Sequence, residues 1–271
     1  MPELPEVESV ARALRAGLTG RRVTGLSVRF AGVLEPSARA VRAAALDRVL
    51  SGVHRRGKYL VLTFTGDDGR AGHLLLHLRM SGQLLFEPDA PADKHTHLVW
   101  DFEGRPLHYR DVRKFGRWSV VEHPTDPQAM AHIGPDMLTV TFKDWDTRVR
   151  ARRAPWKSVL LDQGVASGIG NIYADEALFR ARVHPLAKPC DADEAVRRAV
   201  WKAAKGVLRL AVNHGGTTFL DFRNFHGKPG NFRRKLRVFQ RDGEPCGVCD
   251  AELERIVVGG RSTHFCPVCQ G

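Results

Sequence analysis

The chain has 271 residues, of which 43% are hydrophobic and 27% are charged, and its formal net charge is +12. This length is enough for two domains with cores of their own, and the composition is ordinary for a globular protein. The excess of Lys and Arg favours a polyanionic partner, because neutralised phosphates release counterions. Since no apolar run approaches the ~20 residues that cross a bilayer and no signal peptide precedes the acidic start, we expect a cytoplasmic protein.

The first residues combine a proline with two acidic side chains. Pro2 follows the initiator Met1 directly, and Glu3 and Glu6 come next. An initiator methionine is normally removed before a residue this small, which would leave a free secondary amine at the mature N-terminus. Such an amine titrates not far above neutrality and is a potential nucleophile with carboxylates nearby.

The next hundred residues change from a helical to a β pattern. Val7 to Leu18 has the apolar spacing of an amphipathic helix. From Val23 to about Trp118 the apolar runs are short or alternating and are separated by Gly and Asp turns, which indicates a mostly β domain, a sandwich. The expected strands include Tyr59–Phe64, His73–Leu78, Gln83–Phe86 and His97–Phe102.

Two basic segments of this β region are candidates for contact with DNA. Lys58 enters a strand beside two arginines, and its ammonium suits a phosphate contact, proton transfer or plain solvation. Arg113 and Phe115 alternate with Lys114 on one predicted turn. An aromatic side chain beside an arginine is suited to wedge into a base stack, although a surface hairpin with one core aromatic has the same pattern.

The second half of the chain is predicted to be helical. A Pro- and Asp-rich passage from His123 to Asp136 is interpreted as the domain connection. A glycine-rich segment with basic flanks, Gly227 to Asn231, predicts a mobile loop. The expected helices are Trp156–Gln163, Ile172–Ala181, Asp193–His214 and a short one near Phe219.

A glycine-rich double turn lies between the first two of these helices. Gly164, Gly168 and Gly170 allow the backbone to turn tightly and to approach a ligand closely. The next helix begins near Asn171, so that its backbone N–H groups and the Asn171 amide would converge on an anion. A helical hairpin without a ligand explains the spacing equally well.

The last residues contain two Cys-x2-Cys knuckles. Their sequence C-x2-C-x16-C-x2-C supplies four thiolates for a tetrahedral zinc ion, which leaves no open position and makes the site structural. The ligands are Cys246, Cys249, Cys266 and Cys269. The strand pair between the knuckles would present Arg261 at its tip, where it is within reach of a phosphate or simply solvated. Cys190 stands apart and is interpreted as a packed thiol.

Together these motifs resemble the formamidopyrimidine-DNA glycosylase family of bacterial enzymes, which remove oxidised purines such as 8-oxoguanine. The resemblance covers essentially the whole chain: the N-terminal Met-Pro-Glu-Leu-Pro-Glu, Arg56-Gly-Lys-Tyr-Leu, His77-Leu-Arg-Met-Ser-Gly, Gly168-Ile-Gly-Asn-Ile-Tyr, Gly215-Gly-Thr-Thr and the cysteine ribbon. It implies an α+β multidomain fold. The parts would be a catalytic β-sandwich with flanking helices at 1–125, a helix-two-turn-helix domain at 136–235 and a β-hairpin zinc finger at 236–271.

The resemblance also implies a set of catalytic roles. By motif match, Pro2 would attack C1′ of the damaged nucleotide and form an iminium (Schiff base), which acts as an electron sink. Glu3 would assist opening of the sugar ring as general acid and base, and Glu6 would order the N-terminus. Lys58 would transfer protons during β-elimination, and Arg261 during δ-elimination while it holds the phosphate.

A base that leaves the duplex to reach Pro2 leaves a gap behind it. Met80, Arg113 and Phe115 match the residues that fill this gap in the family, with Arg113 reading the orphaned cytosine. Val112 departs from the family pattern, which frequently has proline there, and this change is expected to loosen the turn. The other DNA contacts implied by the resemblance are His95, Arg113, Arg152, Lys157 and Asn171.

The partner expected from this reading is double-stranded DNA that contains an oxidised purine, bound by a monomer with one structural Zn²⁺. An endonuclease VIII-like enzyme for oxidised pyrimidines shares much of the pattern, but Met80, Arg113 and Phe115 favour the purine enzyme. A non-catalytic zinc-ribbon protein that binds DNA would need no particular residue at position 2. Phe219 and Leu220 fall where relatives vary and bear on lesion preference.

Overall fold

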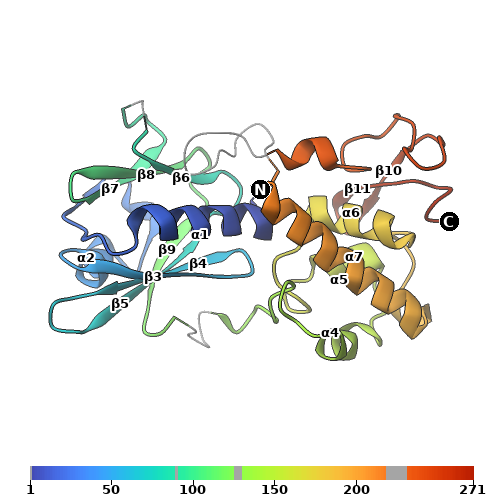
Figure 1. Ribbon diagram of the computed structural model, residues 1–271, viewed down its shortest axis with the longest axis horizontal. Helices are drawn as coiled ribbons and strands as arrows, with labels where there is room; N and C mark the ends of the chain where they lie inside the picture. Colours follow the sequence, from blue (N-terminus) through green and yellow to red (C-terminus); the bar gives the residue numbers. More distant parts are fainter. Residues whose placement is uncertain (1, 89–90, 125–129, 218–230) are drawn as a thin grey trace. The chain divides into compact units, whose positions relative to one another are not determined.

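The computed structural model describes residues 2–88, 91–124, 130–217 and 231–271. The chain forms two compact units (Figure 1), the first comprising Met1–Ala131 and His214–Asn231 and the second His132–Asn213 and Phe232–Gly271. The short helix expected near Phe219, the variable Leu220 and all but the last residue of the loop at 227–231 lie outside the described residues.

The first unit is a β-sandwich of two sheets, as the alternating pattern predicted. One sheet has the order β1 (Gly25–Val28), β7 (Thr96–Phe102), β8 (Arg105–Asp111) and β6 (Gly82–Phe86). The other has the order β2 (Leu34–Glu35), β9 (Arg117–Val121), β5 (Ala71–His77), β4 (Tyr59–Thr65) and β3 (Val49–Arg56). The four strands named from the sequence are thus confirmed, with ends shifted by at most two residues.

Aromatic side chains fill the space between the two sheets. Trp100 on β7 and Trp118 on β9 are 1% exposed, and their rings lie 5.3 Å apart. Phe64 on β4 stacks on Trp100, and Tyr109 on β8 meets Trp118 edge to face. Because the four rings come from both sheets, they set the separation of the layers and fix the ends of the strands from which the loops leave.

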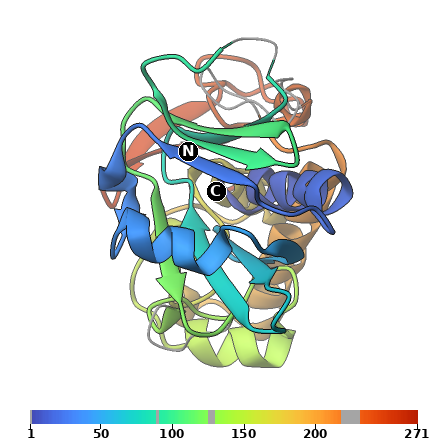
Figure 2. The same ribbon diagram turned by 90° about the vertical axis from the view of Figure 1, so that its left-hand side faces the viewer.

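Two helices accompany the sandwich, and they run beside the sheets in both views (Figures 1 and 2). Helix α1 (Leu4–Leu18) buries Val7, Val10 and Leu14 on the face predicted from their spacing. Helix α2 (Ala38–Ala45) was not anticipated, because its eight residues are too few to show a period. Its start is nevertheless marked by Ser37, whose hydroxyl accepts the N–H of Ala40.

The second unit is helical except for one hairpin. Its helices and strands are α4 (Phe142–Val149), α5 (Trp156–Leu161), α6 (Asn171–Ala181), α7 (Glu194–Asn213), β10 (Glu254–Val258) and β11 (Arg261–Phe265). Short 3-10 turns lie at Pro189–Asp191 and Phe232–Lys235, and the first unit has another at Ala31–Val33. Three of these helices match the expected ones. Helix α6 is buried on almost every side and packs against α5, α7 and β11. None of the described helices has the length and apolar character that spanning a membrane requires.

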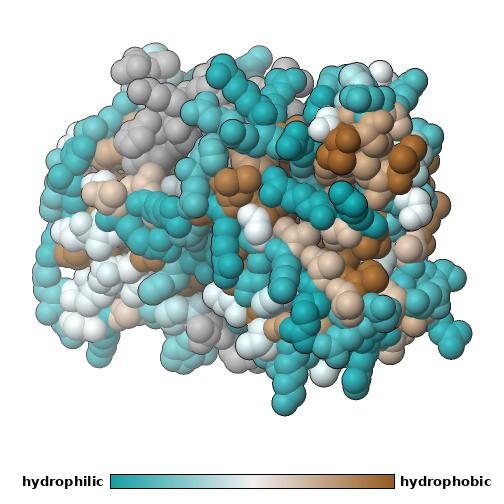
Figure 3. Space-filling model, turned by 45° about the vertical axis from the view of Figure 1, so that its right-hand side comes forward, coloured by the Kyte–Doolittle hydropathy of each residue, from teal (hydrophilic) through white to brown (hydrophobic). Residues whose placement is uncertain are grey.

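The face of the molecule shown in Figure 3 is mostly hydrophilic, with hydrophobic residues gathered in a few places. Six of the large apolar side chains exposed among the described residues lie in two sets, and Phe30 and Leu186 stand apart from both. Val248, Val257 and Val268 are exposed around the cysteine ribbon, and Met80, Val112 and Phe115 are exposed on turns of the sandwich. Single exposed apolar residues are common in proteins.

Candidate functional site

The N-terminal residues are held by the carboxylate of Glu6. This side chain is 1% exposed, and it accepts the backbone N–H of Glu3 at 2.8 Å and that of Thr217 at 2.7 Å. Pro2 and Glu3 are themselves buried at the start of α1. The backbone of Gly216 has φ +80°, and a Cβ at this position would lie 2.7 Å from Glu6 Oε1. The Gly-Gly-Thr segment and the first turn of α1 are therefore fitted to one another.

Lys58 lies on the turn between β3 and β4 and is 7% exposed. The turn is tied to α1 by Arg55, whose Nε donates to Glu8 at 2.8 Å and whose Nη1 donates to the carbonyl of Gly57 at 3.0 Å. Arg15 of α1 also contacts Glu8. Burial alone would raise the pKa of Glu8, but the hydrogen bonds and charges of the two arginines hold it below the usual value. The helix that follows Pro2 and the turn that carries Lys58 thus share one ionic contact.

The three residues expected to fill the gap in DNA lie on two turns of the sandwich. Met80 is 40% exposed on the turn between β5 and β6, and Phe115 is 48% exposed on the turn between β8 and β9. The guanidinium of Arg113 lies 4.7 Å from the centre of the Phe115 ring. Both turns therefore present apolar or flat cationic surface to the exterior.

His95 lies half-buried on the loop before β7. Asp93 organises this loop, because its carboxylate accepts the backbone N–H of His95, the hydroxyl of Thr96 and the guanidinium of Arg110. Although burial raises the pKa of Asp93, these hydrogen bonds lower it to about 2. The carboxylate is therefore ionised at neutral pH and holds the His95 backbone in place.

Lys157 and Asn171, which the resemblance implies as DNA contacts, bond to neighbouring elements of the second unit. The Lys157 side chain is completely buried, and its ammonium donates to the carbonyl of Asn171 at 2.9 Å and to Asp175 at 2.6 Å. The Asn171 amide nitrogen donates to the carbonyl of Ser262 on β11. Asp175 also accepts the backbone N–H and the ring nitrogen of His264 on β11, each at 3.0 Å. In this arrangement the two side chains join helices α5 and α6 to the hairpin.

The two remaining arginines lie at the surface of the second unit. Arg261 is exposed at the start of β11, beside a turn in which Gly259 and Gly260 have φ values of +57° and +73°. It thus lies at the tip of the hairpin, where the sequence had placed it. Arg152 is exposed after α4 and lies 3.5 Å from a carboxylate oxygen of Asp162. An exposed pair of this kind leaves the guanidinium accessible to another anion.

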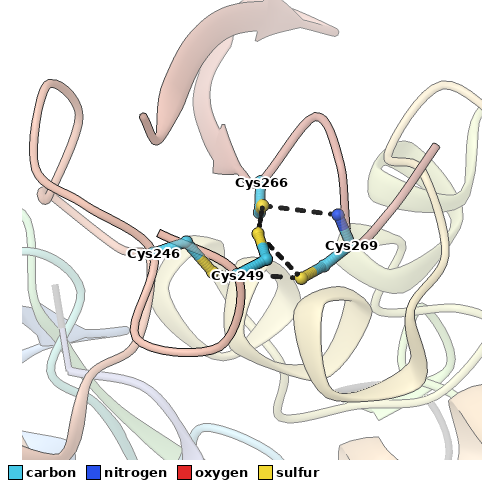
Figure 4. Close-up of side chains that lie close together, drawn as sticks. All are labelled: Cys246, Cys249, Cys266 and Cys269. Carbon is cyan, nitrogen blue, oxygen red and sulfur yellow. Dashed lines mark hydrogen bonds between the residues drawn. The ribbon is translucent and has the colours of Figure 1, made fainter. Parts of the chain in front are cut away.

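The four cysteines come together as predicted (Figure 4). They converge from two turns, and all four Sγ atoms lie within 4.8 Å of one another. Individual Sγ–Sγ distances are 3.9 Å for Cys246 and Cys269 and 3.4 Å for Cys249 and both Cys266 and Cys269. Tetrahedral Zn–S bonds of about 2.3 Å require separations of about 3.8 Å, so the set fits a zinc ion. Cys190 is exposed, which corrects the expectation of a packed thiol.

Three buried acidic residues that the sequence reasoning did not single out support these elements. Asp111 precedes the turn that carries Arg113, and Asp175 and Glu176 lie in α6. The Oε1 atom of Glu176 accepts the backbone N–H groups of three consecutive residues, Arg237 to Phe239. The signal in the sequence was two adjacent acidic residues inside an otherwise apolar helix, since such residues are rarely buried without partners.

Three segments of the chain match models of known protein families. Residues 1–118 match the formamidopyrimidine-DNA glycosylase N-terminal domain, residues 133–222 the formamidopyrimidine-DNA glycosylase H2TH domain, and residues 243–271 a zinc finger found in FPG and IleRS. The chain is 41% identical to the formamidopyrimidine-DNA glycosylase of Herpetosiphon aurantiacus, with all of both chains covered. It is also 41% identical to that of Chloroflexus aurantiacus, covering 100% of this chain and 98% of the other.

Two solved structures are similar over nearly the full length. A complex between a Lactococcus lactis FPG mutant and a Fapy-dG containing DNA has a TM-score of 0.90 and is 33% identical, with 99% of each chain covered. The MutM (FPG) protein of Thermus thermophilus has a TM-score of 0.88 and is 36% identical, with 100% of this chain and 99% of the other covered.

Proposed function

The chain belongs to the formamidopyrimidine-DNA glycosylase family, and we propose that it excises oxidised purines from duplex DNA with the Pro2 amine as nucleophile. It is a DNA glycosylase and an AP lyase with one structural Zn²⁺. The observation that carries the proposed chemistry is the buried first turn of α1, where Glu6 fixes the backbone beside Pro2 and Glu3. Burying a carboxylate is costly unless it is hydrogen-bonded, and Glu6 meets this need by accepting the N–H groups of Glu3 and Thr217.

The glycosylase step begins once Met1 has been removed and the Pro2 nitrogen is a secondary amine. Its lone pair attacks C1′, and the bond from C1′ to the base breaks, so that the base leaves with the bonding pair and takes up the proton that the amine nitrogen loses. Glu3 protonates O4′, the C1′–O4′ bond opens, and the nitrogen lone pair forms the iminium. Glu6 contributes by holding the Glu3 backbone rather than by touching the sugar.

The lyase steps follow from the iminium. Because it withdraws electrons, a proton at C2′ becomes acidic, and its removal expels the 3′ phosphate. Lys58, on the turn tied to α1 through Arg55, is the group we assign to proton transfer in this β-elimination. Arg261, exposed at the hairpin tip, binds the phosphate that leaves in the second, δ-elimination. Hydrolysis of the remaining iminium returns the Pro2 amine.

The protein reaches the lesion by extruding it from the duplex. Met80, Arg113 and Phe115 fill the gap, and Arg113 donates to the cytosine that has lost its partner. His95 and Arg152 contact the backbone, and Asn171 and Lys157 position the hairpin that carries Arg261. The four thiolates hold Zn²⁺, which supplies folding energy to that hairpin. We also propose that the protein acts in the cytoplasm, at the nucleoid. It acts as a monomer.

The test is borohydride trapping of untagged protein on duplexes that carry 8-oxoguanine opposite cytosine, with an oxidised-pyrimidine duplex alongside. Intact mass first establishes that Met1 has been removed. We expect a covalent adduct on the 8-oxoguanine duplex that Pro2→Gly strongly reduces, because it replaces the cyclic secondary amine with a primary one, and that Glu3→Gln weakens with the secondary amine intact. Adduct mainly on the pyrimidine duplex would favour the endonuclease VIII-like alternative, and no adduct on either would leave a DNA-binding protein without catalysis.

A further inference from the structure

The turn that carries Arg113 and Phe115 is built around the carboxylate of Asp111. This residue is 0% exposed, and its Oδ2 atom accepts the backbone N–H of Gly116 at 2.8 Å and the hydroxyl of Tyr109 at 3.1 Å. Its Oδ1 atom accepts the backbone N–H of Arg113 at 3.2 Å. The carboxylate therefore fixes both ends of the turn, before and after the Phe115 ring.

The same carboxylate extends to the turn that carries Met80. The hydroxyl of Ser81 donates to Asp111 Oδ1 at 2.5 Å and accepts the backbone N–H of Arg113 at 3.1 Å. Ser81 is 3% exposed, so this bridge is shielded from water. Gly82 and Asp111 are cross-strand partners of β6 and β8, which means that both turns leave the sheet at the same end.

The backbone of Asp111 connects a third DNA-contacting segment. Its N–H donates to the carbonyl of His95 at 2.9 Å, and its carbonyl lies 2.7 Å from Nε2 of His97, which must donate because a carbonyl only accepts. Gly116 is also constrained, since a Cβ there would lie 1.8 Å from the Tyr109 hydroxyl. One residue thus contacts three loops of the sandwich.

We propose that Asp111 is a positioning residue for base extrusion, which through Ser81 holds the Met80 turn and the Arg113–Phe115 turn in one arrangement before DNA binds. The inference rests on the proposed function. Side chains that enter a duplex gap together must be ordered together, and ordering them in the free protein removes that entropic cost from binding. The need is greater here because Val112 occupies the position where a proline would stiffen the turn.

The experiment compares two activities of the same variants. Excision of 8-oxoguanine from a duplex under single-turnover conditions needs extrusion, whereas cleavage of an abasic site in single-stranded DNA needs the Pro2 chemistry but no base to extrude. Ser81→Ala cuts the bridge between the turns, and Asp111→Asn places an amide against the N–H of Gly116. Asp101→Asn is the matched control, because Asp101 accepts the N–H of Gly104 in a turn at the other end of the same sheet.

We expect both test variants to lower duplex excision by about tenfold or more while single-stranded cleavage changes by less than about twofold. The preference for cytosine over adenine opposite the lesion should narrow in parallel, because Arg113 loses its backbone support. Asp101→Asn should leave the ratio of the two activities unchanged. Equal loss of both activities, no loss, or the same change in the control would overturn the assignment. Wild-type protein that cleaves neither substrate would instead refute the proposed function, and the inference with it.

Discussion

The sandwich turns and the zinc hairpin both depend on buried carboxylates, but the charge of those carboxylates is compensated differently. Asp111 is bonded to neutral donors, which are backbone N–H groups and hydroxyls. Asp175 in α6 pairs with the fully buried ammonium of Lys157 and with His264. The first arrangement positions loops without a counter-charge, and the second introduces a cation whose burial is tolerable only while its partner is present. Replacing Asp111 and replacing Asp175 should therefore lower the free energy of unfolding by different amounts.

The largest effect is expected at the buried ion pair. Asp175→Asn leaves the Lys157 ammonium uncompensated, and we expect a loss of about 3–5 kcal/mol in the free energy of unfolding. Lys157→Met should cost a similar amount, whereas the double variant Lys157→Met with Asp175→Leu should recover much of it, because two apolar side chains replace the pair. Denaturant titration of the zinc-loaded protein measures all three. A double variant as unstable as the sum of the singles would show that the charges are not the cause.

The position of the Lys157 ammonium could not be predicted from the sequence. The motif identified the residue, but the position of its ammonium depends on Asp175, eighteen residues later on another helix. The strands from β4 to β7 could be predicted because their period is visible in each segment alone. Helices α2 and α4 could not, since eight residues show little period and only the caps at Ser37 and Thr141 marked their starts. A carboxylate that accepts backbone N–H groups, such as that of Asp111, cannot be recognised from the sequence, because nearly every residue has such an N–H group.

The contact between Glu6 and the Gly-Gly-Thr segment offers a sharper comparison within the first unit. Gly215 and Gly216 have φ values of +73° and +80°, so alanine at either position introduces about 1 kcal/mol of backbone strain. Only at Gly216 would the new Cβ also meet the Glu6 carboxylate, at 2.7 Å. At Gly215 the nearest atom is the Ser9 hydroxyl, at 3.9 Å.

We therefore expect Gly216→Ala to lower the rate of borohydride trapping by about tenfold more than Gly215→Ala, although the two variants lose similar stability from strain. Trapping at fixed time points, with thermal unfolding of each variant alongside, separates the two effects. The same loss of trapping in both variants would indicate that the strain of the segment matters and that the position of Glu6 does not.

A smaller effect on the stability of the protein is expected at Glu176, whose carboxylate accepts three backbone N–H groups. Burial is the main influence on this group and raises its pKa above the usual value, although the three hydrogen bonds oppose the change. A carboxyl with a raised pKa in the folded state binds its proton more tightly there, so its contribution to stability is complete below the unfolded-state pKa and is lost as pH rises through the folded-state pKa.

Wild-type protein should consequently gain stability relative to Glu176→Gln as pH falls from neutrality towards about 5, with a slope of at most about 1.4 kcal/mol per pH unit. The glutamine keeps an oxygen for the three N–H groups, which makes it a fair reference. Urea titrations of both proteins at a series of pH values give the difference directly. A difference that grows as pH rises would reverse the sign and place the folded-state pKa below the unfolded one.

The smallest effect is expected from Val112→Pro, a substitution that tests how far Asp111 already orders the Arg113–Phe115 turn. The backbone N–H of Lys114 donates to the carbonyl of Asp111, so Val112 occupies the second position of a four-residue turn, where proline is favoured in the common turn types. Val112→Pro should stabilise the folded protein by about 0.4–1 kcal/mol through the unfolded chain. In the Ser81→Ala background it should restore part of the lost duplex excision, because proline stiffens the turn independently of the bridge. Equal gains in excision with and without Ser81 would mean that the hydroxyl does not order this turn.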